Sequence, residues 1–245
     1  MFDLPYRRVE GLAGSIVRLL GLALPIPDPT LRSRRAKTRS VQIPRRSRGG
    51  PIDVVVDSTG LKVYGEGEWK VRWHGAGQRR TGRKVHWAVD ADVKDVVAVE
   101  VTPESRTDRE VLAGLLEPMD DPIGHVRADG AYDTHGVYTA AEERGAEVTI
   151  PPRKNAGPWA PDPPRPQALA AVAVHGRPAW KQAVGDHRRG IAENARYRFK
   201  RLLGDRLASR WFETQVTEVH VRVAALNVMT YLGMPVSVPC RVVLS

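Results

Sequence analysis

An uninterrupted apolar run, Val54–Val56, is flanked by two acids, Asp53 and Asp57. Because continuous β-branched residues are typical of a strand buried on both faces, we expect a central strand here. Burial of a lone carboxylate is costly, so we expect Asp57 to emerge at the end of this strand, in a site that holds a cation or a base. A β-turn before Gly60 fits the same residue types equally well.

The pattern then changes to short strands and amphipathic helices. Val85–Val89 and Val96–Val101, separated by a polar turn, predict an antiparallel hairpin. Alternating helices and strands follow, at 107–117, 125–130, 134–144 and 147–150. We expect Thr107 to cap the first helix and Asp133 or Thr134 to cap the second. Strand, helix and strand in this order imply parallel pairing, so the whole predicts an α/β layer with an antiparallel edge.

Two longer helices are predicted near the C-terminus, at Gly190–Arg206 and Glu213–Leu232, from apolar residues at helical steps. Between the last strand and these helices, residues 155–188 contain many prolines, and we interpret them as an insertion or flexible loop. Gln167–Val174 could form a short apolar helix within it. Residues 236–245 predict an extended tail.

The N-terminal part has a different character. Val9–Leu20 has the spacing of one short helix. Pro29–Gly50 then carries cations without any acid: Arg32, Arg34, Arg35, Lys37, Arg39, Arg45, Arg46 and Arg48. We interpret this block as a mobile basic arm that contacts phosphates, and as the boundary between an N-terminal region, 1–50, and a catalytic domain, 51–235. A linker that only improves solubility is the alternative.

Charge narrows the class of partner. The chain has 38 lysine and arginine residues against 28 aspartate and glutamate residues, a net charge of +10. Such an excess favours a polyanion, and without a basic amphipathic segment suited to lipid we expect nucleic acid rather than a membrane. One cysteine, Cys240, excludes an internal disulfide framework and indicates a reduced, cytoplasmic setting.

Three acids occupy comparable places in the predicted elements. Asp57 follows the first strand, Asp129 follows the strand after the first helix, and Glu193 lies on a late helix. Parallel strands that end at one edge bring their terminal carboxylates together, and a helix across that edge can add the third. Clustered carboxylates suit Mg²⁺, and two such ions can serve phosphodiester chemistry. Asp133 is the rival for the second position, although helix capping would account for it.

The helix that carries Glu193 also has three cations on the same face, Arg189, Arg196 and Lys200. They would offset the repulsion between acids and hold a nucleic-acid backbone. Ion pairs within the helix, worth a few tenths of a kcal/mol, are the structural alternative.

With these motifs, the chain resembles the DDE transposases of bacterial insertion sequences, in the branch with an RNase H-like catalytic domain. The resemblance is carried by Val55–Lys62, by Ala128–Asp133 and by the spacing of Arg189, Glu193 and Lys200, and it covers about Leu4–Val238. The spacing is similar to the family's Tyr-two-Arg-three-Glu-six-Lys signature, but the tyrosine position is Asp186 here. The family's N-terminal helical domain usually starts further upstream, so the resemblance implies a chain that is short at its N-terminus.

The resemblance implies a fold, a chemistry and partners. The fold would be an RNase H-like mixed sheet flanked by helices. Asp57, Asp129 and Glu193 would hold two Mg²⁺ ions, which Mn²⁺ could replace, for strand cleavage and strand transfer. We expect a homodimer or higher oligomer on double-stranded DNA, associated with the bacterial nucleoid. The predicted DNA-binding residues are Arg189, Arg196, Lys200, Lys62, Arg79, Arg80, Arg34, Arg35, Arg45 and Arg46.

Two rival functions remain open at this level. One is a structure-selective, Mg²⁺-dependent DNA nuclease of the same fold, and the other is a truncated, inactive transposase remnant that still binds DNA. Other chemistry is poorly indicated: the histidines lack zinc spacing, and the Gly75–Gly82 stretch, which we interpret as a basic flap on DNA, lacks the ending of a P-loop.

Overall fold

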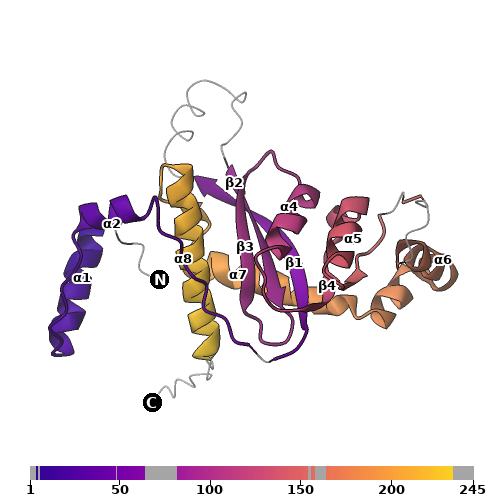
Figure 1. Ribbon diagram of the computed structural model, residues 1–245, viewed down its shortest axis with the longest axis horizontal. Coiled ribbons are helices and arrows are strands. Elements are labelled where there is room, and N and C mark those ends of the chain that lie inside the picture. The colour runs from indigo at the N-terminus through magenta and orange to yellow at the C-terminus, as the bar shows by residue number, and fades with distance from the viewer. Residues whose placement is uncertain are drawn as a thin grey trace, which may run out of the picture.

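A six-stranded mixed sheet forms the centre of the protein (Figure 1). The computed structural model describes residue 4 and residues 6–47, 49–63, 82–153, 156–157 and 164–233. The strands are β1 Ile52–Val63, β2 Gly82–Asp90, β3 Val96–Pro103, β4 Ile123–Arg127, β5 Glu147–Thr149 and β6 Arg206–Leu207. Their order is β3-β2-β1-β4-β5, with β6 paired to the far end of β1. The β2–β3 hairpin is antiparallel and β4 and β5 run parallel to β1, as the sequence pattern predicts.

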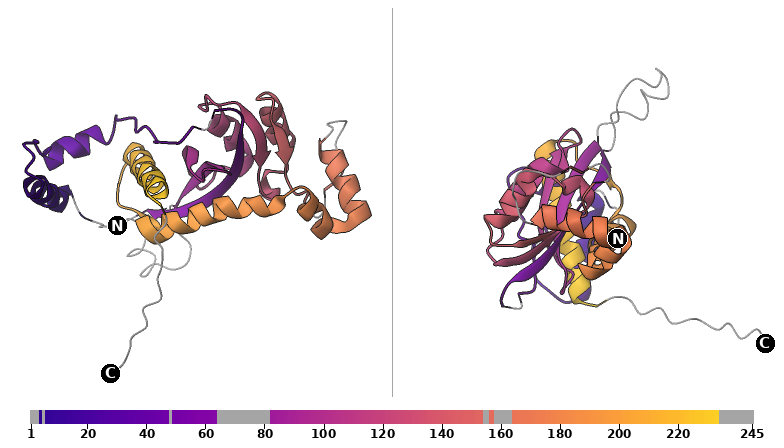
Figure 2. Two further views of the ribbon diagram at one scale, coloured as in Figure 1. Left: turned by 90° about the horizontal axis from the view of Figure 1, so that it is seen from below. Right: turned by 90° about the vertical axis from the view of Figure 1, so that its right-hand side faces the viewer.

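Helices cover both faces of this sheet. Their bounds are α1 Tyr6–Leu19, α2 Pro29–Arg35, α4 Asp108–Leu116, α5 His135–Glu142, α6 Pro164–Ala183, α7 Gly190–Leu203 and α8 Phe212–Tyr231. Short 3-10 turns, η1 Gly130–Tyr132 and η2 Asp186–Arg189, precede α5 and α7. Viewed from below, α7 runs along the sheet while α1 and α2 lie well away from the strands (Figure 2). No helix in the described part of the chain is long and apolar enough to cross a membrane.

Side chains that alternate along the strands build two hydrophobic cores. One face of β1, including Val54 and Val56, packs with α4 and α5. The other face, including Val55 and Leu61, packs with α7 and α8. Because successive strand residues point to opposite faces, Asp57 belongs to the α7 face and Ser58 to the α4 face.

The central strand is longer than the sequence pattern predicts. β1 continues past Asp57 to Val63, because β2 pairs with it from Val54 to Lys62 and β6 pairs with its last two residues; Asp57 stands opposite Trp87. The expectation that Asp57 emerges at the end of the strand is therefore wrong. The neighbouring parallel strand β4 ends close to Asp57 instead, because it pairs with β1 only as far as Val55.

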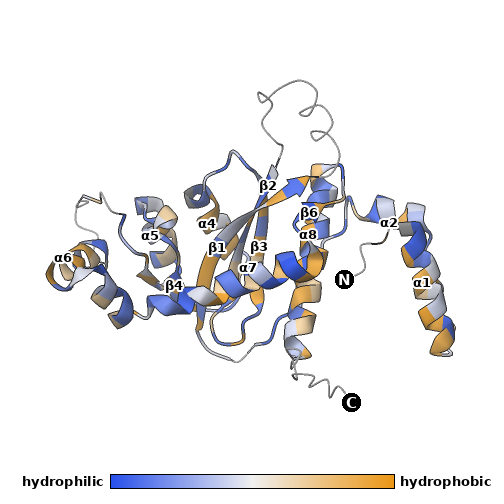
Figure 3. Ribbon diagram, turned by 180° about the vertical axis from the view of Figure 1, so that it is seen from behind, coloured by the Kyte–Doolittle hydropathy of each residue, from blue (hydrophilic) through white to orange (hydrophobic). Residues whose placement is uncertain are grey.

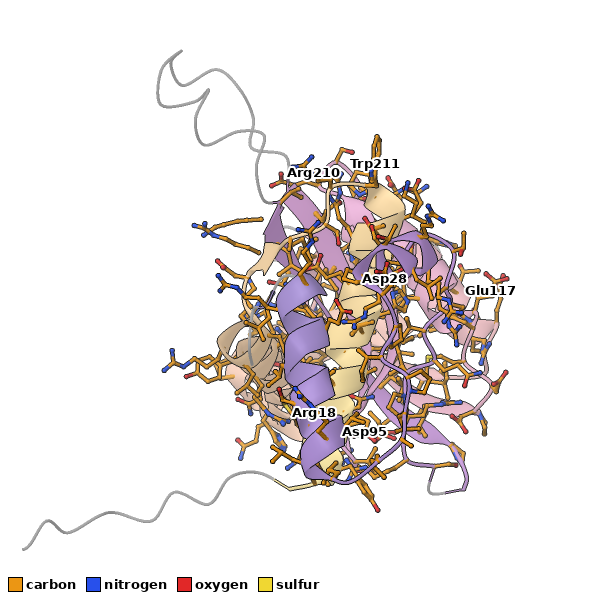
Figure 4. The ribbon with its side chains drawn as sticks, turned by 90° about the vertical axis from the view of Figure 1, so that its left-hand side faces the viewer. Arg18, Asp28, Asp95, Glu117, Arg210 and Trp211 are labelled. Atoms are coloured by element: carbon orange, nitrogen blue, oxygen red, sulfur yellow. The ribbon has the colours of Figure 1, made fainter. Side chains whose placement is uncertain are left out.

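Two segments expected to be irregular are ordered. Residues 155–188 contain α6, a helix kinked at Gly176, so the interpretation as a loop is wrong for that part. In the basic block, Pro29–Arg35 forms α2, whose first amides are capped by Asp28, and Arg46 pairs with Asp95 at 2.7 Å. Asp95 is labelled beside α8 in Figure 4. Acids distant in sequence, Asp121 and Asp95, supply counter-charges to Arg45 and Arg46, so these two arginines are anchored to the predicted catalytic domain.

The predicted helix caps also differ. Thr107 and Thr134 occupy the N-cap positions of α4 and α5, but neither side chain makes a capping hydrogen bond. Asp133 does not cap α5 either and has partners described below. Residues 236–245, which predict a tail, lie outside the described residues.

Candidate active site

Asp57 lies where the sheet loses one of its parallel neighbours. On one side of it β2 continues, and on the other β4 has ended and the chain leads through Ala128 to Asp129. The valines before Asp57 are fully buried, which anchors the backbone that carries its carboxylate. The fold thus places two of the three predicted acids on adjoining segments at the centre of the sheet.

The carboxylate of Asp57 is only partly satisfied. Its Oδ1 accepts a hydrogen bond from the Ser58 amide at 2.8 Å. Its Oδ2 is buried and accepts no hydrogen bond, although Arg196 Nη1 lies 3.5 Å away. Burial raises the pKa of Asp57, the Ser58 amide and Arg196 oppose this, and the charges of Asp129 and Glu193 raise it further.

Asp129 is held by the turn that follows β4. It is the N-cap of η1, and its Oδ1 accepts the Ala131 amide at 2.8 Å. A Cβ at Gly130 would lie 3.2 Å from the Pro151 carbonyl oxygen, so the turn has little room for a side chain there. The orientation of the Asp129 carboxylate therefore follows from local backbone geometry.

Asp133, the rival for the second acid, is already engaged. Its side chain is completely buried, and its carboxylate pairs with Arg165, Nε to Oδ1 at 2.7 Å and Nη2 to Oδ2 at 3.2 Å. The Arg153 amide donates to Oδ2 at 3.1 Å. Asp129 is thus the better candidate, although the reason is this pairing with α6 and not the helix cap that the sequence suggested.

Helix α7 presents apolar residues to the sheet and charged residues beside them. Ala192, Ala195 and Phe199 are buried, and the Phe199 ring lies 5.5 Å from that of Trp87, centroid to centroid. The helix crosses the strands with mixed polar and apolar positions (Figure 3). Since Trp87 is the partner of Asp57 across β1 and β2, this packing sets α7 against the acid.

The charged residues of α7 do not form the intrahelical pairs that the structural alternative predicts. Glu193 is exposed, and within the described residues it has no ion-pair partner. Arg196 is directed to Asp57, and Arg189 pairs with Asp186 at 3.4 Å. Lys200 lies near Arg196 and Asp57, and burial followed by the charge of Arg196 lowers its pKa.

Asp186, at the position where the family signature has tyrosine, is nearly buried in η2. It accepts a hydrogen bond from Arg189 and forms an ion pair with Lys181 on α6, whose Nζ lies 3.1 Å away. The aspartate therefore ties Arg189 to the turn at the start of α7.

The three acids are electrostatic neighbours, but their side chains do not converge. The charges of Asp129 and Glu193 both act on Asp57. Across the described ranges, no three histidine, cysteine, aspartate or glutamate side chains are close enough to hold a metal ion together. Asp57 Oδ2 and the exposed carboxylate of Glu193 are nevertheless suitable oxygen donors for a hard cation.

The other predicted DNA-binding residues differ in their surroundings. Lys62 pairs with Asp205 at 3.1 Å, and both side chains are about half exposed. Arg34 and Arg35 are exposed on α2. Arg45 pairs with Asp121, as Arg46 does with Asp95. Arg79 and Arg80, with the whole Gly75–Gly82 flap up to Thr81, lie outside the described residues.

Comparison with known proteins decides the family. A family model described as "Transposase DDE domain" matches residues 48–228, and a second with the same description matches residues 1–66. The chain belongs to the transposase DDE domain family. The RNase H-like fold class is confirmed, because the mixed sheet and its flanking helices accompany this match. The branch of the family and the short N-terminus stay predictions.

Solved structures with which this transposase domain aligns share little sequence with it. A piggyBac transposase synaptic complex with hairpin DNA aligns at a TM-score of 0.45 and 9% identity, over 74% of this chain and 47% of that one. The catalytic core domain of BIV integrase aligns at 0.33 and 13%, over 77% and 88%. The Mos1 strand transfer complex aligns at 0.31 and 11%, over 94% and 79%. The chain thus spans about half the length of the piggyBac transposase.

Sequence reasoning missed one polar cluster beside the site. Lys84 and His86 of β2, to which the sequence reasoning assigned no role, contact Asp108 at the start of α4. The signal that could have found them is a lysine and a histidine two positions apart on one face of an otherwise apolar strand.

Proposed function

We propose that this protein is a DNA transposase that cleaves DNA strands and transfers them. In this proposal Asp57, Asp129 and Glu193 are the acids that would hold Mg²⁺. Membership of the transposase DDE domain family and the net charge of +10 support it. When bound, the metal ions would supply Lewis-acid activation of the attacking oxygen and stabilisation of the leaving one.

The observation that carries the proposal is the buried Asp57 oxygen that accepts no hydrogen bond from the described residues. A buried carboxylate oxygen without a hydrogen bond is costly, because nothing replaces the water it loses on folding. Two further carboxylates act on the same group, so the fold gathers negative charge that the Ser58 amide and Arg196 offset only in part. Such an arrangement is typical of a site whose missing partner is a cation.

The neighbouring cations have a matching role in the proposal. Arg196 and Lys200 lie beside Asp57 on α7, and we assign them to the backbone phosphates of a strand placed at the acids. Arg189, held by Asp186, would contact DNA from a fixed position at the start of the same helix. We further propose that the protein acts as a homodimer or higher oligomer on double-stranded DNA in the bacterial cytoplasm.

A strand-transfer assay tests the function. Duplex oligonucleotides that carry the inverted repeats flanking the gene are incubated with target plasmid and Mg²⁺, and cleaved and joined products are separated. We expect both products from the wild type and neither from Asp129→Asn or Glu193→Gln. Glu213→Gln, which removes an exposed carboxylate at the start of α8, is the matched control and should keep both.

The outcomes separate the rival functions. Cleavage without joined products would favour a nuclease of the same fold. DNA binding without either product would favour an inactive remnant. Metal-dependent cleavage that survives loss of Asp129 or Glu193 would refute the assignment of the acids.

A further inference from the structure

A polar cluster lies on the α4 face of the sheet, directly behind the candidate site. It consists of Ser58, Lys84, His86, Asp108 and Tyr132, which come from β1, β2, α4 and η1. Ser58 and His86 are cross-strand partners in the β1–β2 register, next to the Asp57–Trp87 pair. Each strand therefore places one residue toward α7 and the next toward this cluster.

Asp108 is the centre of the cluster. Lys84 Nζ donates to its Oδ2 at 2.7 Å, and His86 Nδ1 lies 3.2 Å from its Oδ1, a close approach without the alignment of a hydrogen bond. Burial alone would raise the pKa of Asp108, but the contacts with His86, Lys84 and Ser58 outweigh it and hold the pKa well below its usual range.

Tyr132 connects this centre to the second acid. Its side chain is buried, and its hydroxyl donates to Asp108 Oδ1 at a long 3.5 Å. Burial, followed by the charges of Asp108, Asp129 and Asp57, strongly raises the pKa of Tyr132, so the hydroxyl stays protonated. Tyr132 is also the last residue of η1, the turn that Asp129 caps, and its amide donates to the Asp129 carbonyl oxygen at 3.0 Å.

Stability alone does not account for such a cluster. Taking ionic groups out of water offsets most of their mutual attraction, and apolar residues of similar size often stabilise a fold equally well. The cluster replaces apolar packing where α4 meets β2, although leucines of α4 supply such packing one turn later. What it adds is directional contact between the strand that carries Asp57 and the turn that carries Asp129.

We propose that Asp108 and Tyr132 are positioning residues that set the separation of Asp57 and Asp129. This inference rests on the proposed function, since the two acids matter there as metal ligands. Ser58 links the contact to Asp57 on one side, because its amide donates to Asp57 Oδ1 and its cross-strand partner His86 lies 3.2 Å from Asp108 Oδ1. Tyr132 transmits it on the other side through η1. Neither positioning residue touches DNA or metal in this proposal.

Mn²⁺ binding to the full chain without DNA tests the positioning role, with free Mn²⁺ counted by electron paramagnetic resonance. Tyr132→Phe and Asp108→Asn should each weaken Mn²⁺ binding about tenfold, the loss typical of removing an outer partner of a metal ligand. Because Asp108 and Tyr132 act through one contact, the double variant should bind Mn²⁺ about as tightly as the single variant with the lower affinity. Cleavage should fall in parallel at limiting Mn²⁺ and recover in part when Mn²⁺ is raised.

Tyr138→Phe is the matched control. Tyr138 is a buried tyrosine of the same hydrophobic core, on α5, and its loss also removes one hydroxyl. We expect it to lower the melting temperature about as much as Tyr132→Phe and to leave Mn²⁺ binding unchanged. Equal Mn²⁺ affinity in Tyr132→Phe and Tyr138→Phe would overturn the inference.

Asp57→Asn distinguishes failure of the inference from failure of the proposed function. If Asp57→Asn abolishes Mn²⁺ binding while Tyr132→Phe and Asp108→Asn do not weaken it, only the positioning role is wrong. If Asp57→Asn leaves Mn²⁺ binding unchanged, the metal assignment fails, and the positioning role fails with it.

Discussion

Asp57 and Asp108 lie on opposite faces of the β1–β2 pair, and their carboxylates differ in the donors and charges that surround them. Asp108 is met by Lys84, His86 and Ser58, and its pKa is held low. Asp57 has one amide donor and an ion pair with Arg196 at 3.5 Å, and its pKa is raised by burial and by two further acids. On the α4 face, the charge of Asp108 is therefore compensated by residues of the chain itself. On the α7 face, one oxygen of Asp57 accepts no hydrogen bond from the described residues.

This difference matters because the two side chains are exposed to solvent to a similar extent. Both carboxylates are mostly buried, with 17% and 15% of the side chain exposed for Asp57 and Asp108. Depth alone would not separate them, so the distinction lies in the number and charge of their donors. The carboxylate with fewer compensating partners, Asp57, is the candidate for ligand binding, and the fully paired Asp108 is the candidate for holding the surrounding elements in position.

Neutralising Asp57 should give the largest effect, and in opposite directions for activity and stability. Asp57→Asn should lower the DNA cleavage rate about a thousandfold, because metal-assisted chemistry is worth several kcal/mol in the transition state. The same change removes an under-compensated buried charge and should raise stability by about 1 kcal/mol. Single-turnover cleavage and urea unfolding measure the two quantities. A variant that loses stability along with activity would contradict the contrast.

Phe199 tests the apolar support of the α7 face. Phe199→Ala should destabilise the fold by about 4 kcal/mol, since it leaves a cavity against Trp87 in a fully buried position. Urea unfolding followed by tryptophan fluorescence gives the value. Tyr197→Ala, on the exposed side of the same helix, is the control and should change stability little.

Removing the charge of Asp108 should cost about 2 kcal/mol of stability, because Lys84 would be left partly buried without a counter-charge. Asp120→Asn, an exposed acid in the following loop, is the control and should have little effect. A stability loss in Asp108→Asn no larger than that in Asp120→Asn would remove the distinction between the two faces.

Thermal unfolding at several pH values sharpens the same prediction, since the two acids should respond oppositely. The folded pKa of Asp108 is lowered, so its contribution is present above the unfolded pKa of about 3.9 and is lost as the pH falls below it. The stability advantage of wild type over Asp108→Asn should therefore shrink below about pH 4. The folded pKa of Asp57 is raised, so its penalty is complete above that pKa and vanishes below about pH 4.

The smallest stability effect is expected at Lys62. Its pair with Asp205 is exposed, so Lys62→Ala should change stability by less than about 0.5 kcal/mol. DNA binding is the informative measurement: loss of one phosphate contact should lower the salt dependence of binding by about one unit. Asp205→Asn, which frees Lys62, should not weaken binding, and an unchanged salt dependence in Lys62→Ala would remove it from the DNA interface.

Much of the architecture was predictable because it depends on short-range patterns. Periodicity located the hairpin, the parallel strands and the two last helices within a few residues. It failed for α6, because its prolines occupy the first turn and a kink, positions that helices tolerate. It also failed for the basic block, whose counter-charges are supplied by Asp95 and Asp121, far away in the chain.

For the candidate site too, some features followed from the sequence and others depended on tertiary contacts. Motif spacing sufficed to name Asp57, Asp129 and Glu193 as candidates, because residue type and order along the chain carry that information, although the expected strand end at Asp57 was wrong. Only the tertiary structure decided that Asp133 is taken by Arg165, that Arg196 turns to Asp57 and that Asp108 is saturated while Asp57 is not. These contacts join residues from 22 positions apart, His86 and Asp108, to 139 positions apart, Asp57 and Arg196, and the electrostatic state of a carboxylate depends on what folding brings beside it.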